Sequence, residues 1–210
     1  MAIRIKICGL TNRMDAAAAV EAGADAVGFV FHKKSPRCAE VAAVKAIVTE
    51  LPPFILPVGV FINEDAKVVR DVMDGCGLAL AQLHGDETAV YCETLGRPVL
   101  KAIRLKDRRS FLALAEFQGR AGVRGFLLDA FSSEAYGGTG QVADWSLAAE
   151  AASATPILLA GGLTPGNVSD AIKQVRPYGV DVSSGVEASP GKKDQEKLRA
   201  FVQAVRLVSS

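Results

Sequence analysis

The sequence predicts an α/β protein, a single-domain (β/α)8 barrel of the TIM type, from three observations. Short runs of β-branched residues alternate eight times with longer helical patterns rich in alanine and charge. The spacing between successive runs leaves room for a loop, one helix and a return loop. The chain has 210 residues, of which 50% are hydrophobic and 22% charged, so it can bury one sizeable core without a second domain.

The expected strands are short apolar runs bounded by turn residues. They lie near 3–8, 25–31, 56–62, 78–83, 98–103, 124–129, 156–160 and 179–183, with a helix after each. Strict alternation implies a parallel sheet with right-handed crossovers. The alternative is a doubly wound open sheet, which usually has about five or six strands and a GxGxxG first turn. The first turn here is Cys8-Gly9-Leu10-Thr11, so we expect a closed barrel spanning 1–210 as one domain.

Helix ends are predicted from residues that cap helices. The expected N-caps are Thr11, Asn63, Asp86, Asp107, Thr164 (followed by Pro165) and Asp194. Gly23 and Gly75 are expected to end two helices. The longest irregular stretches, 131–141 and 187–193, follow the carboxyl ends of strands. Barrel active sites are built at those ends, and mobile loops there can shield a reaction from water.

Composition excludes several classes of function. The net charge is +1 and the basic residues are dispersed, which argues against nucleic acid or an anionic membrane as a partner. The cysteines at 8, 38, 76 and 92 form no CxxC pair, and there are only two histidines, so a zinc site is not expected. No apolar run approaches the roughly 18 residues that cross a bilayer. We expect a soluble, cytoplasmic protein with reduced thiols.

The first strand carries a candidate catalytic thiol. Its period-two pattern places Ile3, Ile5 and Ile7 on one face and Lys6 and Cys8 on the other. The thiol comes at the end of the strand, before a glycine turn and a helix start, where barrel enzymes keep their chemistry. The alternative is that Cys8 is a small buried hydrophobe, the usual role of a free cysteine.

If Lys6 and Cys8 face inward, the alternation of side chains along each strand places further polar residues in the same interior. They are Gln82, His84, Lys101, Asp129, Asp181 and Ser183. A thiol, a histidine and two carboxylates together exceed what packing requires. Asp129 follows an apolar run and is interpreted as a partly buried acid rather than a helix cap, whereas His84 either contacts a ligand or is a satisfied core histidine.

Two glycine-rich turns predict a phosphate site. They follow the seventh and eighth strands, and their candidate residues are Gly161, Gly162, Ser183, Ser184 and Gly185. Glycines let backbone N–H groups approach an anion, and a short helix after the eighth strand would add a favourable dipole. A Gly-Gly pair is often only a tight turn. At this position in a barrel, however, many enzymes hold a phosphate.

Six short motifs occur in order nearly from one end of the chain to the other. They are Lys6–Leu10 (KICGL), Gln82–Gly85 (QLHG), Leu128-Asp129, Gly137–Gly140 (GGTG), Leu159–Leu163 (LAGGL) and Val180–Glu187 (VDVSSGVE). This set resembles the phosphoribosylanthranilate isomerase family. Other phosphate-binding barrels share the last two glycine turns but not the earlier motifs in this order.

The resemblance implies an isomerase of tryptophan biosynthesis. It rearranges N-(5-phosphoribosyl)anthranilate to 1-(2-carboxyphenylamino)-1-deoxyribulose 5-phosphate without a cofactor or metal. The expected partner is this small phosphoribosyl substrate, bound by a monomer or homodimer. Cys8 is the candidate general base and Asp129 the candidate general acid. Lys6 is expected to lower the pKa of the Cys8 thiol, which is mostly protonated at neutral pH in a free cysteine.

The resemblance also implies how the substrate is bound. Arg37 matches the family residue that contacts the anthranilate carboxylate, and a guanidinium suits that planar group. Asp181 would hold the amine or a ribose hydroxyl, and His84 would contact the substrate. The phosphate would lie on the backbone of the two glycine-rich turns, at Gly161, Gly162, Ser183, Ser184 and Gly185.

Two alternatives remain. Indole-3-glycerol phosphate synthase, or another phosphosugar barrel, would share the last two turns but carry catalytic lysine and glutamate in earlier strands. An inactive barrel that senses a phosphorylated ligand would keep the phosphate site while losing Cys8 or Asp129. This chain has both residues.

Overall fold

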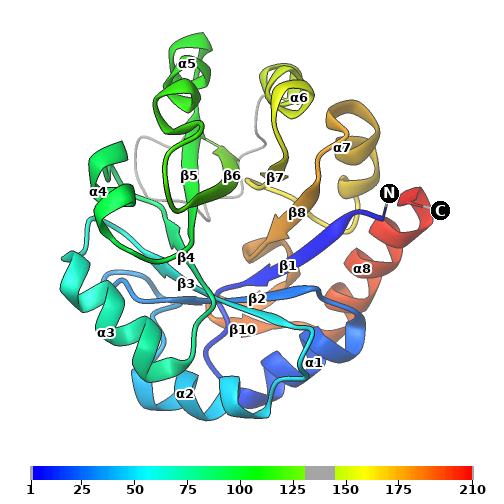
Figure 1. The fold of residues 1–210 in the computed structure, drawn as a ribbon. Coiled ribbons are helices and arrows are strands. Elements are labelled where there is room, and N and C mark those ends of the chain that lie inside the picture. Colours follow the sequence, from blue (N-terminus) through cyan, green and yellow to red (C-terminus); the bar gives the residue numbers. More distant parts are fainter. Residues whose placement is uncertain (1, 131–144, 210) are drawn as a thin grey trace.

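Eight parallel strands close into a barrel in the computed structural model, which describes residues 2–130 and 145–209 (Figure 1). The strands are β1 (Arg4–Cys8), β2 (Ala26–Val30), β3 (Leu56–Phe61), β4 (Leu80–Leu83), β5 (Val99–Leu105), β6 (Val123–Ala130), β7 (Ile157–Leu159) and β8 (Gly179–Val182). Each strand pairs with the next in the chain, and β1 also pairs with β8. The predicted fold class and all eight strands are confirmed.

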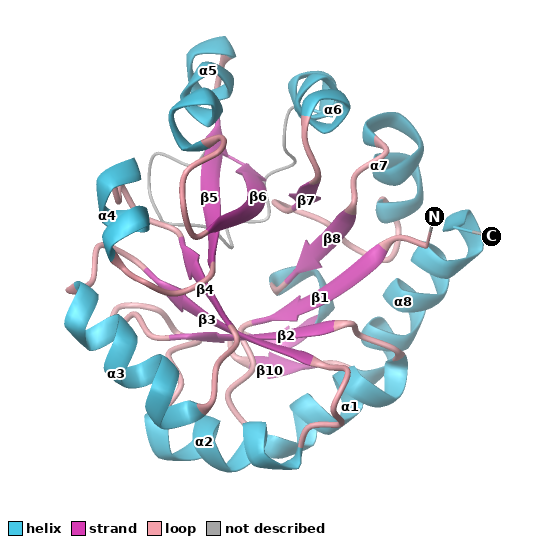
Figure 2. Ribbon diagram, in the orientation of Figure 1, coloured by secondary structure: helices cyan, strands magenta, loops and turns pink. Residues whose placement is uncertain are grey.

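The helices form an outer ring around these strands (Figure 2). They are α1 (Arg13–Ala22), α2 (Val41–Glu50), α3 (Ala66–Cys76), α4 (Ala89–Thr94), α5 (Arg108–Phe117), α6 (Trp145–Ala154), α7 (Val168–Val175) and α8 (Gln195–Ser209). Most of the buried apolar side chains lie between this ring and the strands. A smaller cluster, Leu100, Ala102, Leu127 and Ala160, fills the barrel interior. None of the described helices is long and apolar enough to cross a membrane.

Capping residues lie where they were predicted in three places, two at the start of a helix and one at its end. The Asp107 side chain accepts a hydrogen bond from the amide of Ser110 at the start of α5, and Asp194 accepts from two amides at the start of α8. Gly23 follows α1 in a left-handed conformation. The prediction for Gly75 is wrong, because α3 continues to Cys76 and Gly77 is its C-cap.

The remaining N-caps lie slightly further along the chain than predicted. They are Asn12 instead of Thr11, Asp65 instead of Asn63, Thr88 instead of Asp86, and Asn167 instead of Thr164. Two of the residues predicted as caps make tertiary contacts instead. The Thr11 hydroxyl donates to the carbonyl of Gly191 at 2.7 Å, and the Asn63 side-chain oxygen accepts from the amide of Asp86 at 2.7 Å.

The loop after β8 is more regular than predicted. A single 3-10 turn, η1 (Ser184–Val186), leads into an antiparallel pair of short strands, β9 (Glu187–Ser189) and β10 (Lys192–Lys193). The expectation of an irregular stretch over 187–193 is therefore wrong, because Glu187 and Lys193 are both buried and paired with each other. The other predicted loop, 131–141, lies outside the described residues.

Candidate active site

A cavity of about 470 Å³ opens at the carboxyl ends of the barrel strands. The predicted site residues that line it are Cys8, Arg37, His84, Asp129, Gly161, Gly162, Asp181, Ser183 and Ser184. Gly185, the remaining predicted residue, is not part of the lining. The segment between β2 and α2 also contributes His32, Lys34 and Ser35, which the sequence did not single out.

A buried ion pair lies beneath the thiol. The Lys6 Nζ donates to the Asp181 Oδ1 at 2.7 Å, and the two residues are direct partners in the β1–β8 register. Burial raises the pKa of the Cys8 thiol, and the charge of Asp181 adds to that effect. The cations Lys6 and Lys193 oppose it without cancelling it. The expectation that Lys6 lowers the pKa of Cys8 below its ordinary value is therefore wrong, because desolvation exceeds the attraction.

A hydrogen-bonded chain joins the candidate acid to β4. The His84 Nε2 lies 3.0 Å from the Asp129 Oδ2, and the His84 Nδ1 lies 2.9 Å from the Gln82 Nε2. Because the Gln82 amide nitrogen only donates, His84 Nδ1 is the acceptor and the ring proton is on Nε2, directed at Asp129. Among the described residues the buried Gln82 Oε1 has no hydrogen-bond partner. Parity places Gln82 and His84 on the same face of the chain, as predicted.

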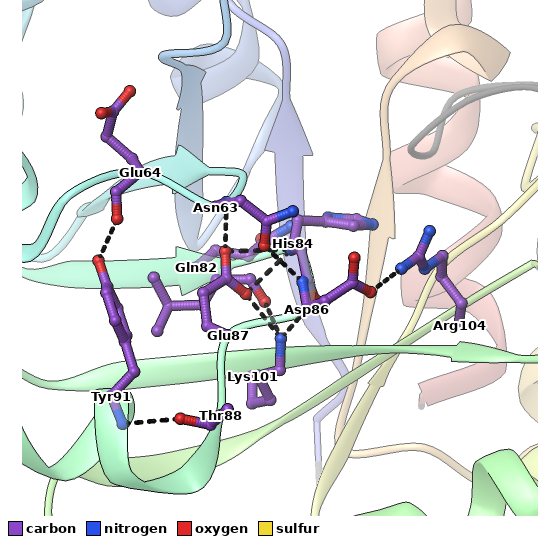
Figure 3. Close-up of polar contacts among 12 residues, drawn as sticks. Asn63, Glu64, Gln82, His84, Asp86, Glu87, Thr88, Tyr91, Lys101 and Arg104 are labelled. Atoms are coloured by element: carbon purple, nitrogen blue, oxygen red, sulfur yellow. Dashed lines mark hydrogen bonds and ion pairs between the residues drawn. The ribbon is translucent and has the colours of Figure 1, made fainter.

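Behind His84, a second buried ion pair stabilises the turn that follows β4 (Figure 3). The Glu87 carboxylate accepts from the amides of Asn63 and Gly85 and lies 2.8 Å from the Lys101 Nζ. Lys101 also donates to the carbonyl of Gly85 at 2.8 Å. The lysine therefore bonds to the same turn as the carboxylate, and together they fix the backbone that follows His84.

The prediction that Lys101 faces the barrel interior is wrong. Its strand neighbour Leu100 belongs to the interior cluster and pairs in register with the inward-facing Gln82. Successive side chains alternate between the two faces, so Lys101 points outward. There its Nζ lies 5.7 Å from the ring centroid of Phe117 on α5.

The two glycine-rich turns meet at one end of the cavity. Gly161 and Gly162 have φ angles of +89° and +67°, and within the described part of the chain their N–H groups donate to no other residue. Unpaired amides at a cavity wall are suited to an anion. Gly185 has another role: a Cβ there would lie 1.8 Å from the carbonyl oxygen of Leu163, so this glycine lets the two turns pack together. The η1 turn is only three residues long, so its dipole is a minor contribution beside these amides.

Arg37 lies at another part of the rim and is held by a carboxylate. Its Nε and Nη2 donate to the Glu187 Oε1 and Oε2 at 2.8 and 2.7 Å. The Lys193 Nζ lies 3.0 Å from the same carboxylate. Burial alone would raise the pKa of Glu187, but Arg37 and Lys193 outweigh it and lower that pKa. Sequence reasoning missed Glu187 and Lys193, although Glu187 closes one of the six motifs.

The cavity therefore brings together a thiol, a carboxyl group and two sets of groups suited to anions. Cys8 and Asp129 come from different strands, β1 and β6, and both face the same space. The glycine turns suit a phosphate, and the Arg37 guanidinium suits a carboxylate. Such a site fits acid–base chemistry on a ligand with an anionic group at each end.

Comparisons with known proteins agree with this chemistry. A family model described as N-(5'phosphoribosyl)anthranilate (PRA) isomerase matches residues 5–204. N-(5'-phosphoribosyl)anthranilate isomerase of Pseudomonas fluorescens (strain Pf0-1) is 51% identical over 205 residues, which cover 98% of this chain and 99% of that protein. The enzyme of the same name from Pelobacter propionicus is 48% identical, with 97% and 96% covered.

Solved structures show the same similarity. Phosphoribosyl anthranilate isomerase from Thermotoga maritima has a TM-score of 0.89 and 42% identity, with 97% of this chain and 98% of that chain covered. A crystal structure of phosphoribosyl anthranilate isomerase in complex with reduced 1-(o-carboxyphenylamino)-1-deoxyribulose 5-phosphate has a TM-score of 0.86 and 40% identity, with the same coverage.

Proposed function

The chain belongs to the N-(5'-phosphoribosyl)anthranilate isomerase family, an enzyme family of tryptophan biosynthesis, and on that premise we propose that Cys8 is the general base and Asp129 the general acid of its reaction. The reaction is the Amadori rearrangement of N-(5-phosphoribosyl)anthranilate to 1-(2-carboxyphenylamino)-1-deoxyribulose 5-phosphate. The observation that carries the assignment is that both residues face one cavity, which has anion-binding groups in two places.

The acid acts first. Protonated Asp129 donates its proton to the ribose ring oxygen, the C1–O bond breaks, and the nitrogen lone pair forms the iminium. The positive charge of the iminium acidifies the C2–H bond. Cys8, as thiolate, removes that proton, and the electrons of the C–H bond neutralise the iminium to give the enolamine. Tautomerisation of the enolamine then gives the 2-keto product.

The surrounding residues orient the acid and the substrate. The His84 N–H is directed at the Oδ2 of Asp129 and orients its carboxyl group. Asp181 would accept a hydrogen bond from the anthranilate amine or a ribose hydroxyl. Arg37 would bind the aryl carboxylate. The phosphate would lie against the backbone of Gly161, Gly162, Ser183 and Ser184.

Turnover is tested directly by the loss of the anthranilate fluorescence of N-(5-phosphoribosyl)anthranilate. Folded protein without turnover in this assay would contradict the proposed activity. Turnover that survives in both a Cys8 and an Asp129 variant would contradict only the assignment of the two residues.

The pKa of Cys8 predicts how the reactivity of its thiol depends on pH. The base must be a thiolate, and burial raises the pKa of this thiol above its ordinary value, so the thiolate fraction increases with pH. We therefore expect the rate of Cys8 alkylation by iodoacetamide, followed by mass spectrometry, to rise continuously from pH 6 with no plateau below about pH 8.5. The Cys8→Ser variant, which lacks this thiol, is the control. A plateau by pH 7 would show that the thiol titrates below its ordinary value.

Substitutions at the two ends of the cavity test the orientation of the substrate. Gly162→Val adds a branched side chain at a φ of +67° beside the unpaired amides, so inorganic phosphate and the reduced product analogue should both bind at least about tenfold more weakly. Arg37→Ala should weaken the analogue by about 10- to 100-fold, because it removes charge-assisted hydrogen bonds, and leave phosphate binding unchanged. Both are measured by calorimetry.

Gly75→Val is the matched control for the glycine substitution, because a Cβ at this helical position meets nothing within 4 Å. It should bind both ligands as the parent does. Equal losses of phosphate and analogue in Arg37→Ala would show that Arg37 does not face the carboxylate end. Unchanged phosphate binding in Gly162→Val would show that phosphate does not bind at this turn.

A further inference from the structure

The contact between Arg37 and Glu187 leaves one edge of the guanidinium available. A guanidinium has five N–H groups arranged in a planar fork. Glu187 occupies the edge formed by Nε and Nη2, with distances of 2.8 and 2.7 Å. The opposite edge, formed by Nη1 and the second N–H of Nη2, has no hydrogen-bond partner among residues 2–130 and 145–209. That edge can accept a second carboxylate in the same two-bond geometry.

Lys193 keeps this cluster positively charged. Its side chain is 0% exposed, and its Nζ lies 3.0 Å from the Glu187 Oε1 and 3.1 Å from the carbonyl oxygen of Ser183. Arg37, Glu187 and Lys193 together therefore carry a net charge of one positive unit. A bound carboxylate would complete an alternating row of two cations and two anions, with Glu187 between the two cations.

The hairpin that carries Glu187 and Lys193 is tied to the start of α1. The backbone amide of Lys193 donates to the buried Asp15 Oδ2 at 2.8 Å. The Thr11 hydroxyl donates to the carbonyl of Gly191 at 2.7 Å. The carboxylate therefore projects from a fixed backbone, and the Glu187 side chain itself is only 5% exposed. By contrast, Arg37 comes from an irregular segment and has a long side chain that costs conformational entropy to fix.

We propose that Glu187, held by Lys193, is a positioning residue that fixes the free edge of Arg37 toward the aryl carboxylate of the substrate. This inference rests on the proposed function, in which Arg37 binds that carboxylate. Glu187 does not touch the substrate. It acts by determining the rotamer and the plane of the guanidinium before the substrate arrives, so binding does not have to order that side chain.

Positioning and simple electrostatics predict opposite results for Glu187→Gln. Removal of the negative charge makes the cluster more positive, so electrostatics alone predicts tighter binding of an anionic ligand. If the carboxylate positions Arg37, the same change weakens that ligand, because an amide cannot accept two N–H groups in this geometry and its own NH2 group opposes a cation. Glu187→Asp separates the two effects further, since it keeps the charge but shortens the reach by one methylene.

The experiment compares two ligands by calorimetry: the reduced product analogue and the same compound without its aryl carboxylate. The dissociation constant of the compound without the carboxylate, divided by that of the complete analogue, measures how much the carboxylate contributes to affinity. We expect Glu187→Gln and Glu187→Asp each to reduce this ratio at least about tenfold, and Arg37→Ala to bring it close to one. In turnover, both Glu187 variants should raise KM more than they lower kcat, because the reacting atoms keep their catalytic groups.

Each outcome has a distinct meaning. A ratio equal to or above that of the parent in Glu187→Gln and Glu187→Asp would overturn the positioning role. A parental ratio in Arg37→Ala would instead overturn the proposed carboxylate site. Glu50→Gln, which changes an exposed glutamate paired with Arg13, is the matched control and should leave the ratio unchanged. If Glu187→Gln fails to fold by circular dichroism, the aspartate variant decides the question.

Discussion

Replacing Cys8 by serine or Asp129 by asparagine is expected to lower kcat by about 10²- to 10⁴-fold, the usual contribution of a general acid or base. A serine hydroxyl is far less acidic than a thiol, so it does not supply the base for the C2 proton. Asparagine has no carboxyl proton to donate to the ring oxygen, although its shape preserves the contact with His84. Steady-state turnover of both variants is measured by the loss of substrate fluorescence.

Both variants should retain their affinity for inorganic phosphate, because the glycine turns are untouched. Cys76→Ser is the matched control for the thiol: Cys76 is also buried and free, but its Sγ donates to the carbonyl of Val41 at 3.5 Å and it does not line the cavity. We expect parental kcat and KM for it. Near-parental turnover in Cys8→Ser or in Asp129→Asn would show that the substituted residue does not have its proposed catalytic role.

Lys101→Met is expected to destabilise the protein by about 3–5 kcal/mol, the typical effect of removing one partner of a buried ion pair. The side chains of Lys101 and Glu87 are only 3% and 2% exposed. Methionine fills most of the volume of the lysine stem, so the loss comes mainly from a buried carboxylate left without its cation. Chemical denaturation gives the change in the free energy of unfolding.

A second substitution tests the cause. Adding Glu87→Gln to Lys101→Met removes the unpaired charge and should recover part of the lost stability. Lys67→Met is the matched control, because Lys67 forms an exposed pair with Asp71 on α3. The denaturation midpoint of this variant should hardly differ from that of the parent. Equal stability of Lys101→Met and the parent would mean that the pair is not needed for folding. An additive loss in the double variant would mean that the uncompensated charge is not the cause.

The sequence by itself was sufficient for the architecture and for most of the cavity lining. Alternation of strand and helix patterns is a local property, and repeated eight times it leaves few topologies other than a closed parallel barrel. The period of two within a strand then fixes which side chains share a face. For this reason the sequence alone predicts that Cys8, His84, Asp129 and Asp181 face one space, and all four line the cavity.

Parity within one strand does not determine which of its two faces points inward, and that explains the error at Lys101. The face is determined by how β5 pairs with its neighbours: Leu100 pairs with the inward-facing Gln82, and Lys101 pairs with Leu83 on the outer face. A one-residue change of register turns every following side chain to the other side. Only the assembled barrel could show that Lys101 lies outside, paired with Glu87.

Only the tertiary structure could reveal the support of Arg37 or the pKa of Cys8. Arg37 and Glu187 are 150 positions apart in the chain, and no local pattern links them. The sequence correctly placed a lysine near the thiol, but the pKa depends on a balance between burial, Lys6, Asp181 and Lys193. Desolvation and charge interactions depend on distances in space and on access to water, and the order of residues along the chain specifies neither.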